Sequence, residues 1–155
     1  MSTDLAVFDL DFTLWDAGGT WCDHLSQPFT IDAKGVSDSE GRVVKLYPDA
    51  MEIFQVLEDN NTPMAIASRT EEPEWAKLLL ELLGIRGKFK YEEIFPDSKV
   101  THFKNLQKKS GINFNRMIFF DDEDRNIKEV GTLGVRCHLI KKGINIQEFR
   151  LLFNH

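Results

Sequence analysis

The stretch that decides the fold is Leu5-Ala6-Val7-Phe8-Asp9-Leu10-Asp11-Phe12-Thr13, close to the start of the chain. Its first four residues form a short apolar run bounded by polar residues, which predicts a buried strand. Asp9 and Asp11 follow it two residues apart, although Asp is a poor strand residue. Ligands of open α/β sheets bind beyond the carboxyl ends of the strands. The stretch therefore predicts a strand that delivers two carboxylates to one site, against the alternative of an acidic turn without a function.

Length and composition indicate a soluble globular protein of ordinary size. The chain has 155 residues, of which 42% are hydrophobic and 28% charged, and this is enough to bury a full core. A formal net charge of −6 argues against nucleic acid as a partner. No run approaches the roughly 20 apolar residues that span a membrane, and the start lacks the features of a signal peptide. Cys22 and Cys137 have no zinc-like spacing, so we expect a cytoplasmic protein without disulfides.

Strand and helix patterns alternate along the rest of the chain. Further apolar runs predict strands over 63–67, 91–95, 116–120 and 135–140. Apolar residues at helical spacing predict helices over 50–59, 71–84, 98–110, 124–130 and 146–153, with Gly131 ending the fourth. This alternation is typical of βαβ units. It predicts an α/β, Rossmann-like, mainly parallel sheet with helices on both faces.

One segment, at about 14–47, interrupts this alternation. It is rich in glycine and polar residues, and it is too short and too polar for a second domain. We therefore expect a single domain over 1–155 with a small flap or hairpin over the top of the sheet and no large cap domain.

Polar residues follow three of the predicted strands or begin the next helix, so they share one edge of a parallel sheet. They are Asp9, Asp11, Ser68, Arg69, Lys99, Asp121 and Asp122. Carboxylates that converge without a cation repel one another. Mg²⁺ resolves this, because it prefers oxygen ligands and needs only one or two carboxylates beside a substrate phosphate. The pattern therefore predicts a Mg²⁺ site that takes a phosphorylated ligand.

The residue types at this edge also suit phosphoryl transfer. One carboxylate can attack phosphorus and form an aspartyl-phosphate. A second one, offset by two residues, can protonate the leaving oxygen and later activate water. Lys99 and Ser68 would hold the other phosphate oxygens, and Thr13 would keep the loop around Asp9 in shape.

The motifs resemble a known family at this point. Asp9-Leu10-Asp11-Phe12-Thr13 resembles the DxDxT signature of the haloacid-dehalogenase superfamily of phosphohydrolases. Ser68, Lys99 and the pair Asp121-Asp122 resemble its second, third and fourth motifs, in the right order. The chain is still more similar to the magnesium-dependent phosphatase family within that superfamily, through 5–15, 46–48, 67–70, 98–103 and 119–123.

The resemblance implies a role for each residue. It implies that Asp9 is the nucleophile and a metal ligand, and that Asp11 is the general acid and base, with its backbone carbonyl on the metal. Asp122 becomes the other metal ligand, supported by Asp121. The implied phosphate-binding groups are Ser68, the backbone N–H groups of Leu10 and Arg69, and the ammonium of Lys99.

The same resemblance implies an activity and a setting. It implies a cytosolic, Mg²⁺-dependent phosphomonoesterase that acts on phosphotyrosine or a sugar-type phosphate, either a small molecule or a protein side chain, with no membrane partner. The segment 16–21 departs from the family pattern where the leaving group should lie.

Several alternatives stay open from the residues alone. Trp15 and Trp21 could stack on a leaving group or pack the flap onto the sheet. Arg69 could bind phosphate through its side chain or only through its backbone. Lys99 opens a helix, where a cation opposes the helix dipole, so we expect it to be slightly unfavourable for folding. For His102, on the same helix, we expect no chemistry.

Three alternatives compete with an active phosphatase. One is a phosphatase-like fold retained only to bind a phosphorylated ligand, but every expected catalytic position is filled. A receiver-type domain is phosphorylated on Asp without turnover, but its adjacent acidic pair follows the first strand, whereas here that pair is Asp121-Asp122. A dehalogenase needs no metal and would leave Asp11 and Asp122 without a role.

Overall fold

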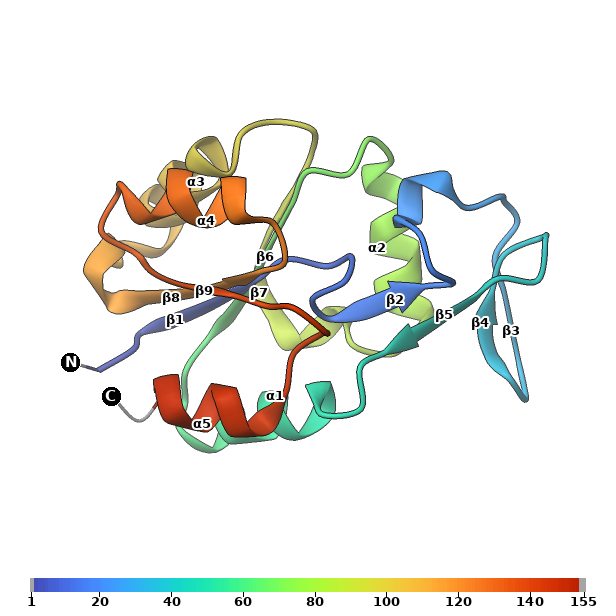
Figure 1. Cartoon of the computed structure of the whole chain (residues 1–155), viewed down its shortest axis with the longest axis horizontal. Helices are drawn as coiled ribbons and strands as arrows, with labels where there is room; N and C mark the ends of the chain where they lie inside the picture. Colours follow the sequence, from blue (N-terminus) through green and yellow to red (C-terminus); the bar gives the residue numbers. More distant parts are fainter. Residues whose placement is uncertain (1, 154–155) are drawn as a thin grey trace.

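The computed structural model describes residues 2–153 and contains a five-stranded sheet at its centre (Figure 1). The strand order is β7-β6-β1-β8-β9, and every neighbouring pair is parallel. The strands are β1 (Leu5–Phe8), β6 (Met64–Ser68), β7 (Phe89–Ile94), β8 (Met117–Asp121) and β9 (Arg136–Leu139). This topology confirms the predicted α/β, Rossmann-like parallel sheet.

Strand β1 lies in the middle of the sheet and is fully buried. Ala6 pairs with Met64 of β6 on one side and with Ile118 of β8 on the other. A parallel strand that is covered on both faces reads as a continuous apolar run, which is what Leu5–Phe8 shows in the sequence. The central position of β1 places Asp9, just after it, at the middle of the carboxyl edge.

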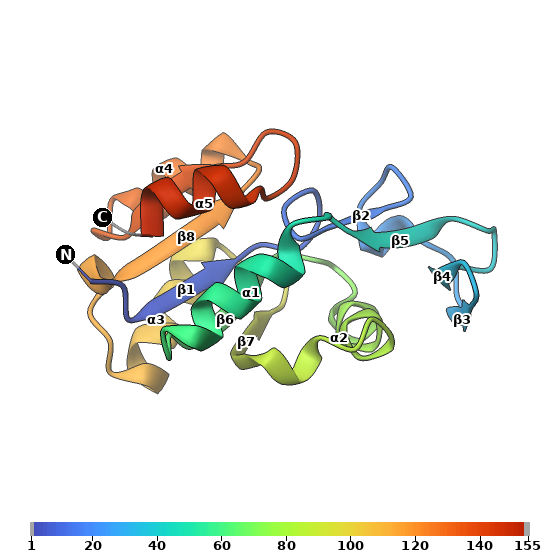
Figure 2. The ribbon, with the colours of Figure 1, turned by 90° about the horizontal axis from the view of Figure 1, so that it is seen from below.

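Helices cover both faces of the sheet (Figures 1 and 2). They are α1 (Ala50–Asp59), α2 (Pro73–Leu82), α3 (Lys99–Ser110), α4 (Asp124–Gly131) and α5 (Ile146–Phe153). Alternate residues of a strand point to opposite faces. Accordingly Phe8 packs in the cluster that contains residues of α1, α2 and α5, whereas Val7 packs in the cluster that contains residues of α3 and α4.

The ends of α3 follow from local sequence. The Ser98 hydroxyl accepts a hydrogen bond from the backbone N–H of Val100 at 3.1 Å, which satisfies a donor of the first turn. Gly111 ends the helix in the left-handed conformation, at a φ of 72°. This cap holds Lys99 at the first position of the helix, on the edge where β1 ends.

Some predicted helix boundaries are wrong by one or two residues; for example, α2 ends at Leu82 and not at Gly84. The second helix begins at Pro73 and not at Glu71, because Glu72 has a non-helical backbone, with a φ of −126° and a ψ of 72°. Gly131 is the last residue of α4 and does not lie beyond it. The left-handed glycine that follows is Gly134, at a φ of 99°.

The segment between β1 and α1 forms a second, antiparallel sheet of four strands in the order β2-β5-β4-β3. Its strands are β2 (Trp15–Ala17), β3 (Thr30–Asp32), β4 (Gly35–Ser37) and β5 (Val43–Leu46). Figures 1 and 2 show that this flap extends from the parallel sheet beside α2, and the outer strands β3 and β4 lie furthest from it. Within residues 2–153, no helix is both long and apolar enough to cross a membrane.

Candidate active site

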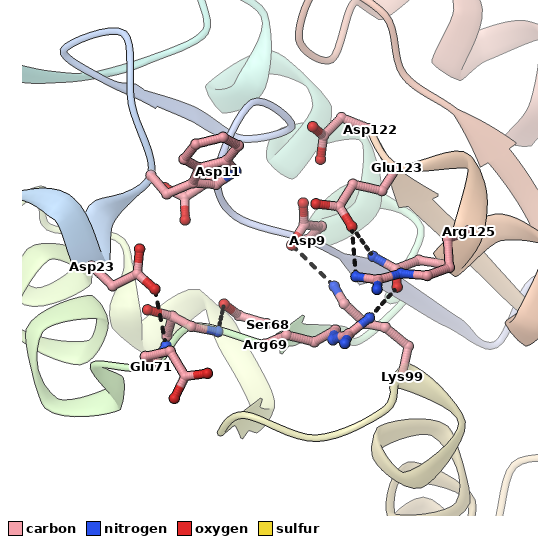
Figure 3. Close-up of a pocket in the computed structure, with 13 residues that line it drawn as sticks. Asp9, Asp11, Asp23, Ser68, Arg69, Glu71, Lys99, Asp122, Glu123 and Arg125 are labelled. Carbon is pink, nitrogen blue, oxygen red and sulfur yellow. Dashed lines mark hydrogen bonds and ion pairs between the residues drawn. The ribbon is translucent and has the colours of Figure 1, made fainter.

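A pocket of about 230 Å³ lies at the carboxyl edge of the parallel sheet, between the flap and α4 (Figure 3). Most of the predicted site residues line it, namely Asp9, Asp11, Trp21, Ser68, Arg69, Lys99 and Asp122. The other three, Leu10, Thr13 and Asp121, are buried and do not line the pocket. Strand ends that lie far apart in the sequence therefore meet where the parallel topology predicts.

The loop after β1 turns sharply so that Asp9 and Asp11 reach the same pocket. The backbone carbonyl of Leu10 accepts hydrogen bonds from the N–H groups of Thr13, Leu14 and Trp15. Phe12 has a φ of 62°, a left-handed conformation that is uncommon for a bulky residue and costs energy. Strained residues of this kind gather at functional sites. The hydroxyl of Thr13 donates to Oδ2 of Asp9 at 3.3 Å, a contact within the loop that we expected Thr13 to keep in shape.

Three carboxylates form an oxygen cluster beside this loop. Asp9, Asp121 and Asp122 each offer an oxygen atom, and these atoms lie within 4.8 Å of one another. Burial raises the pKa of Asp9 well above its usual range, and the charge of Asp121 raises it further. Burial also raises the pKa of Asp122, to about 6. Buried oxygen donors that repel one another are the set that a hard divalent cation such as Mg²⁺ takes, so these residues fit the metal.

Lys99 lies among the same carboxylates and is almost completely buried. Its ammonium lies 3.0 Å from Oδ1 of Asp9 and 3.0 Å from Oδ2 of Asp121, and it also contacts the carbonyl of Ala67. Burial acts to lower the pKa of Lys99, but the two carboxylates outweigh it and raise the pKa. Breaking a buried ion pair costs more than the interaction of one charge with a helix dipole. In place of a slightly unfavourable contribution, we therefore expect Lys99 to stabilise the fold.

Asp11 is held by donors from the flap. The indole N–H of Trp15 donates to its Oδ1 at 2.7 Å, and the backbone N–H of Cys22 donates to the same atom at 2.9 Å. Burial nevertheless raises the pKa of Asp11 to about 7. A carboxyl group with such a pKa can both give and take a proton near neutral pH. Because Trp15 is fully buried in the hydrophobic core at the base of the flap, it does not stack on a leaving group.

The opposite wall of the pocket comes from the end of β6 and from α4. Ser68 is buried, and its hydroxyl accepts from the backbone N–H of Thr70 at 3.3 Å. The side chain of Arg69 extends to α4, where its Nη1 donates to Oδ1 of Asn126 at 3.1 Å (Figure 3). Trp21 is 47% exposed at the pocket and packs edge-on against Phe12. Trp21 is thus the tryptophan that a bound ligand can reach.

Some pocket residues were missed by the sequence analysis. They are Asp23, Thr70, Glu71, Glu123, Arg125 and Asn126. For Asn126 a signal was available, because it lies in the first turn of the helix that begins just after Asp122, at the same edge of the sheet. For Asp23 there was none, since its carboxylate reaches the pocket through the fold of the flap, where it accepts from the backbone N–H of Glu71 at 3.2 Å.

Comparison with known proteins agrees with this geometry. A family model described as acid phosphatase matches residues 2–152. The chain is 50% identical over 145 residues to magnesium-dependent phosphatase 1 of Homo sapiens, which covers 92% of this chain and 81% of the human protein. It is 38% identical over 164 residues to a HAD-like hydrolase superfamily protein of Schizosaccharomyces pombe, covering 96% of this chain and 92% of that protein.

Solved structures show the same fold at much lower identity. A HAD family enzyme from Bacteroides thetaiotaomicron superposes with a TM-score of 0.71 at 13% identity, covering 97% of this chain and 99% of that one. The family that the motifs resemble is therefore confirmed. The family model and the related sequences show that this chain belongs to the acid phosphatase family, among the magnesium-dependent phosphatases of the haloacid-dehalogenase superfamily.

Proposed function

We propose that the protein is a Mg²⁺-dependent phosphomonoesterase that works through an aspartyl-phosphate on Asp9. The observation that carries this proposal is the pairing of two different carboxyl groups at the end of β1. Asp9 lies against the ammonium of Lys99 at 3.0 Å and belongs to the oxygen cluster that fits Mg²⁺. Asp11 lies outside that cluster and accepts a hydrogen bond from Trp15, and burial raises its pKa to about 7. Two carboxyl groups in such different environments suit the separate tasks of nucleophile and acid–base catalyst.

In the first step, an oxygen of Asp9 forms a bond to phosphorus while the bond between phosphorus and the leaving oxygen breaks. The protonated carboxyl of Asp11 gives its proton to that leaving oxygen. In the second step, Asp11 takes a proton from water as the water oxygen attacks phosphorus. The bond between phosphorus and the Asp9 oxygen breaks, which frees inorganic phosphate and restores the carboxylate of Asp9. The hydrogen bond from Thr13 to Oδ2 and the ion pair of Lys99 to Oδ1 support an Asp9 carboxylate that is already oriented for attack.

The phosphate of the substrate would be held by groups around Asp9. We assign this role to the ammonium of Lys99, the hydroxyl of Ser68, and the backbone N–H groups of Leu10 and Arg69. Ser68 and Lys99 line the pocket, which supports their part of the assignment. Donors that are fixed before the reaction stabilise the developing charge on the phosphoryl oxygens.

The residues that would hold Mg²⁺ are the carboxylates of Asp9 and Asp122 and the backbone carbonyl of Asp11, with Asp121 in support. When bound, Mg²⁺ supplies charge that stabilises the transferring phosphoryl group and orients it for in-line attack. The oxygen cluster at the end of β1 and β8 supports this assignment.

For the substrate, we propose phosphotyrosine or a sugar-type phosphate, on a small molecule or a protein side chain, in the cytoplasm. The exposed indole of Trp21 at the pocket supports a leaving group with a flat face. The alternative function is a receiver-type domain that accepts phosphate without turnover. It is less well supported, because a receiver-type domain has no use for Asp11 as an acid and base.

An acid-quench experiment tests the mechanism. The protein is mixed with Mg²⁺ and a phosphomonoester labelled in its phosphate, quenched in acid within the first turnover, and digested for mass spectrometry. We expect labelled phosphate on the peptide that contains Asp9, together with steady release of inorganic phosphate. Label that accumulates without release of phosphate would support the receiver-type alternative, and turnover without label on Asp9 would contradict the aspartyl-phosphate.

A further inference from the structure

A chain of hydrogen bonds and ion pairs joins two basic side chains that line the pocket, Lys99 and Arg69. It passes from Lys99 through Asp121 and Asn126 to Arg69. We propose that Asn126 is a positioning residue, which holds the guanidinium of Arg69 in the pocket so that this side chain binds the phosphate of the ligand. The proposal rests on the proposed function, and it assigns to Arg69 a role for its side chain beyond that of its backbone.

Both polar atoms of the Asn126 side-chain amide form hydrogen bonds. Its Oδ1 accepts from Nη1 of Arg69 at 3.1 Å, while its Nδ2 donates to Oδ2 of Asp121 at 3.1 Å and to Oε2 of Glu123 at 3.3 Å. A guanidinium can only donate and an ionised carboxylate can only accept, so a flipped amide would face both partners wrongly. At 3% exposure, Asn126 is buried, and the cost of burying an unpaired amide maintains this orientation.

Asp121 fixes Asn126 in relation to Lys99. It is fully buried, its Oδ1 accepts from the backbone N–H of Glu123 at 2.8 Å, and its Oδ2 lies 3.0 Å from the ammonium of Lys99. The same carboxylate oxygen thus binds both the lysine and the asparagine. The cations of Lys99 and Arg69 are therefore held in one arrangement by only two intervening side chains.

Asn126 can hold an arginine without neutralising it, because its amide carries no charge. Arg125, the preceding residue on α4, shows the contrast: its Nη2 lies 3.3 Å from Oε2 of Glu123, so its charge is paired with a carboxylate. Arg69 has five N–H donors and gives one of them to Asn126. The fixed guanidinium retains its full charge and further donors for a phosphate, which arginine binds well in a bidentate manner.

The test measures the binding of inorganic phosphate by calorimetry, which does not depend on turnover, and in parallel the hydrolysis of 4-nitrophenyl phosphate with Mg²⁺. The variants are Asn126→Ala, Arg69→Ala and the double variant. We expect Asn126→Ala to weaken phosphate binding about tenfold, the size of one hydrogen bond to a charged group. In the Arg69→Ala background, Asn126→Ala should change phosphate affinity by less than about twofold, because its partner is already absent.

Val130→Ala is the matched control, since Val130 is a buried residue of the same helix with no part in the hydrogen-bond chain. It should lower the melting temperature and leave phosphate affinity unchanged. Arg69→Lys provides a second approach that leaves the buried asparagine intact. It keeps the charge but loses the guanidinium that Asn126 holds, so we expect a loss of phosphate affinity close to that of Asn126→Ala.

The outcomes separate this proposal from the proposed function. Four results would each overturn the role of Asn126, whatever the turnover. Asn126→Ala or Arg69→Lys could bind phosphate with the affinity of wild type, the losses in the double variant could be additive, or the wild type could bind no phosphate. A loss of affinity in Val130→Ala equal to that in Asn126→Ala would overturn it as well. If the predicted pattern of affinities is found in a protein that hydrolyses no phosphomonoester, the role of Asn126 stands and the proposed function fails.

Discussion

The ammonium of Lys99 lies 3.0 Å from Oδ1 of Asp9, a residue 90 positions earlier in the chain. The contact joins the start of α3 to the end of β1, and both groups are largely buried. It also places a cation against the carboxylate that we propose as the nucleophile. We therefore expect both stability and catalysis to depend on this pair of residues.

Replacing Lys99 should affect both properties. In Lys99→Ala, the carboxylates of Asp9 and Asp121 lose their shared cation, and we expect the free energy of unfolding without metal to fall by about 3 kcal/mol. Turnover should fall by a factor of about 10² or more, because a fixed charge at the phosphate is lost. Urea unfolding and the hydrolysis of 4-nitrophenyl phosphate measure the two effects.

Lys128→Ala is the matched control for that variant. Lys128 lies 2.8 Å from Asp124 in an exposed ion pair on α4. Exposed pairs contribute little, so we expect no measurable change in unfolding free energy or in turnover. A Lys99→Ala protein as stable and as active as Lys128→Ala would contradict the importance of the buried pair.

Removing the metal should abolish turnover. We expect excess chelator to stop hydrolysis, added Mg²⁺ to restore it, and Ca²⁺ to inhibit because its larger, looser shell disturbs the in-line geometry. Mg²⁺ should also raise the melting temperature, since it binds the folded chain and relieves repulsion among Asp9, Asp121 and Asp122. In Asp122→Asn this rise should shrink, whereas Asp124→Asn should behave as wild type. Full activity in chelator is the result that would rule out the metal assignment.

The two aspartates at the end of β1 should respond differently to the leaving group. Asp9→Asn should form no aspartyl-phosphate with any substrate. Asp11→Asn should lose the acid and base, at a cost of about 10² to 10⁴ in rate for an alkyl phosphate. Its loss should be smaller with 4-nitrophenyl phosphate, because nitrophenolate needs little protonation. Equal losses of Asp11→Asn on both substrates would count against Asp11 as the acid.

The two tryptophans near the pocket should separate binding from packing. Trp21→Ala should raise KM for an aryl phosphate by about three- to tenfold, the size of an aromatic contact, with little change in the melting temperature. Trp15→Ala should instead lower the melting temperature, because its buried indole packs in the hydrophobic core and donates to Asp11. If Trp21→Ala leaves KM for aryl phosphates unchanged, the leaving group does not contact that indole.

His102 should make stability depend on pH. Burial, assisted by the charge of Lys99, lowers the pKa of His102 from 6.5 to about 4, and its Nε2 lies 3.0 Å from the carbonyl of Phe95. Between these pH values the unfolded chain binds a proton that the folded chain does not. The contribution is therefore fully present above pH 6.5 and is lost as the pH falls toward 4. We expect His102 by itself to account for a loss of about 3 kcal/mol of unfolding free energy over this range, at about 1.4 kcal/mol per pKa unit. The raised pKa values of Asp9, Asp11 and Asp122 act in the opposite direction, so the contribution of His102 is the difference from a variant without this histidine.

Urea unfolding at pH 7, 5.5 and 4 measures that dependence. His102→Gln keeps a donor for the carbonyl of Phe95 but does not titrate, so its stability should fall less over this range than that of wild type. His24→Gln is the control, because the side chain of His24 is 61% exposed. If wild type and His102→Gln show the same pH dependence, the buried histidine has no part in it.

The parallel sheet and the position of the candidate site could be predicted from sequence because their signals are local. Four apolar residues followed by Asp9 and Asp11 specify a buried strand and its polar end, and the cap of Ser98 specifies where α3 begins. Parallel connections then require all carboxyl ends to share one edge. These rules are sufficient to bring Asp9, Ser68, Lys99 and Asp122 to one pocket.

The flap could not be predicted in the same detail. Its strands have three or four residues each, and β3 is exposed along its whole length, so its sequence lacks the alternation that indicates a half-buried strand. Short strands of this kind are stable only through pairing with one another. The alternatives for Trp15 and Trp21 stayed open for this reason, since burial of a flap residue depends on the sheet as a whole.

The sequence by itself determined the residue types, their order and the edge of the sheet at which they gather, because helix and strand periodicity act over a few neighbouring residues. Only the tertiary structure decided which of these groups touch. It placed Trp15 under Asp11, Lys99 between two carboxylates, and Asn126 between Asp121 and Arg69. Hydrogen bonds and ion pairs act over about 3 Å, a distance that no spacing along the chain specifies until the backbone has folded.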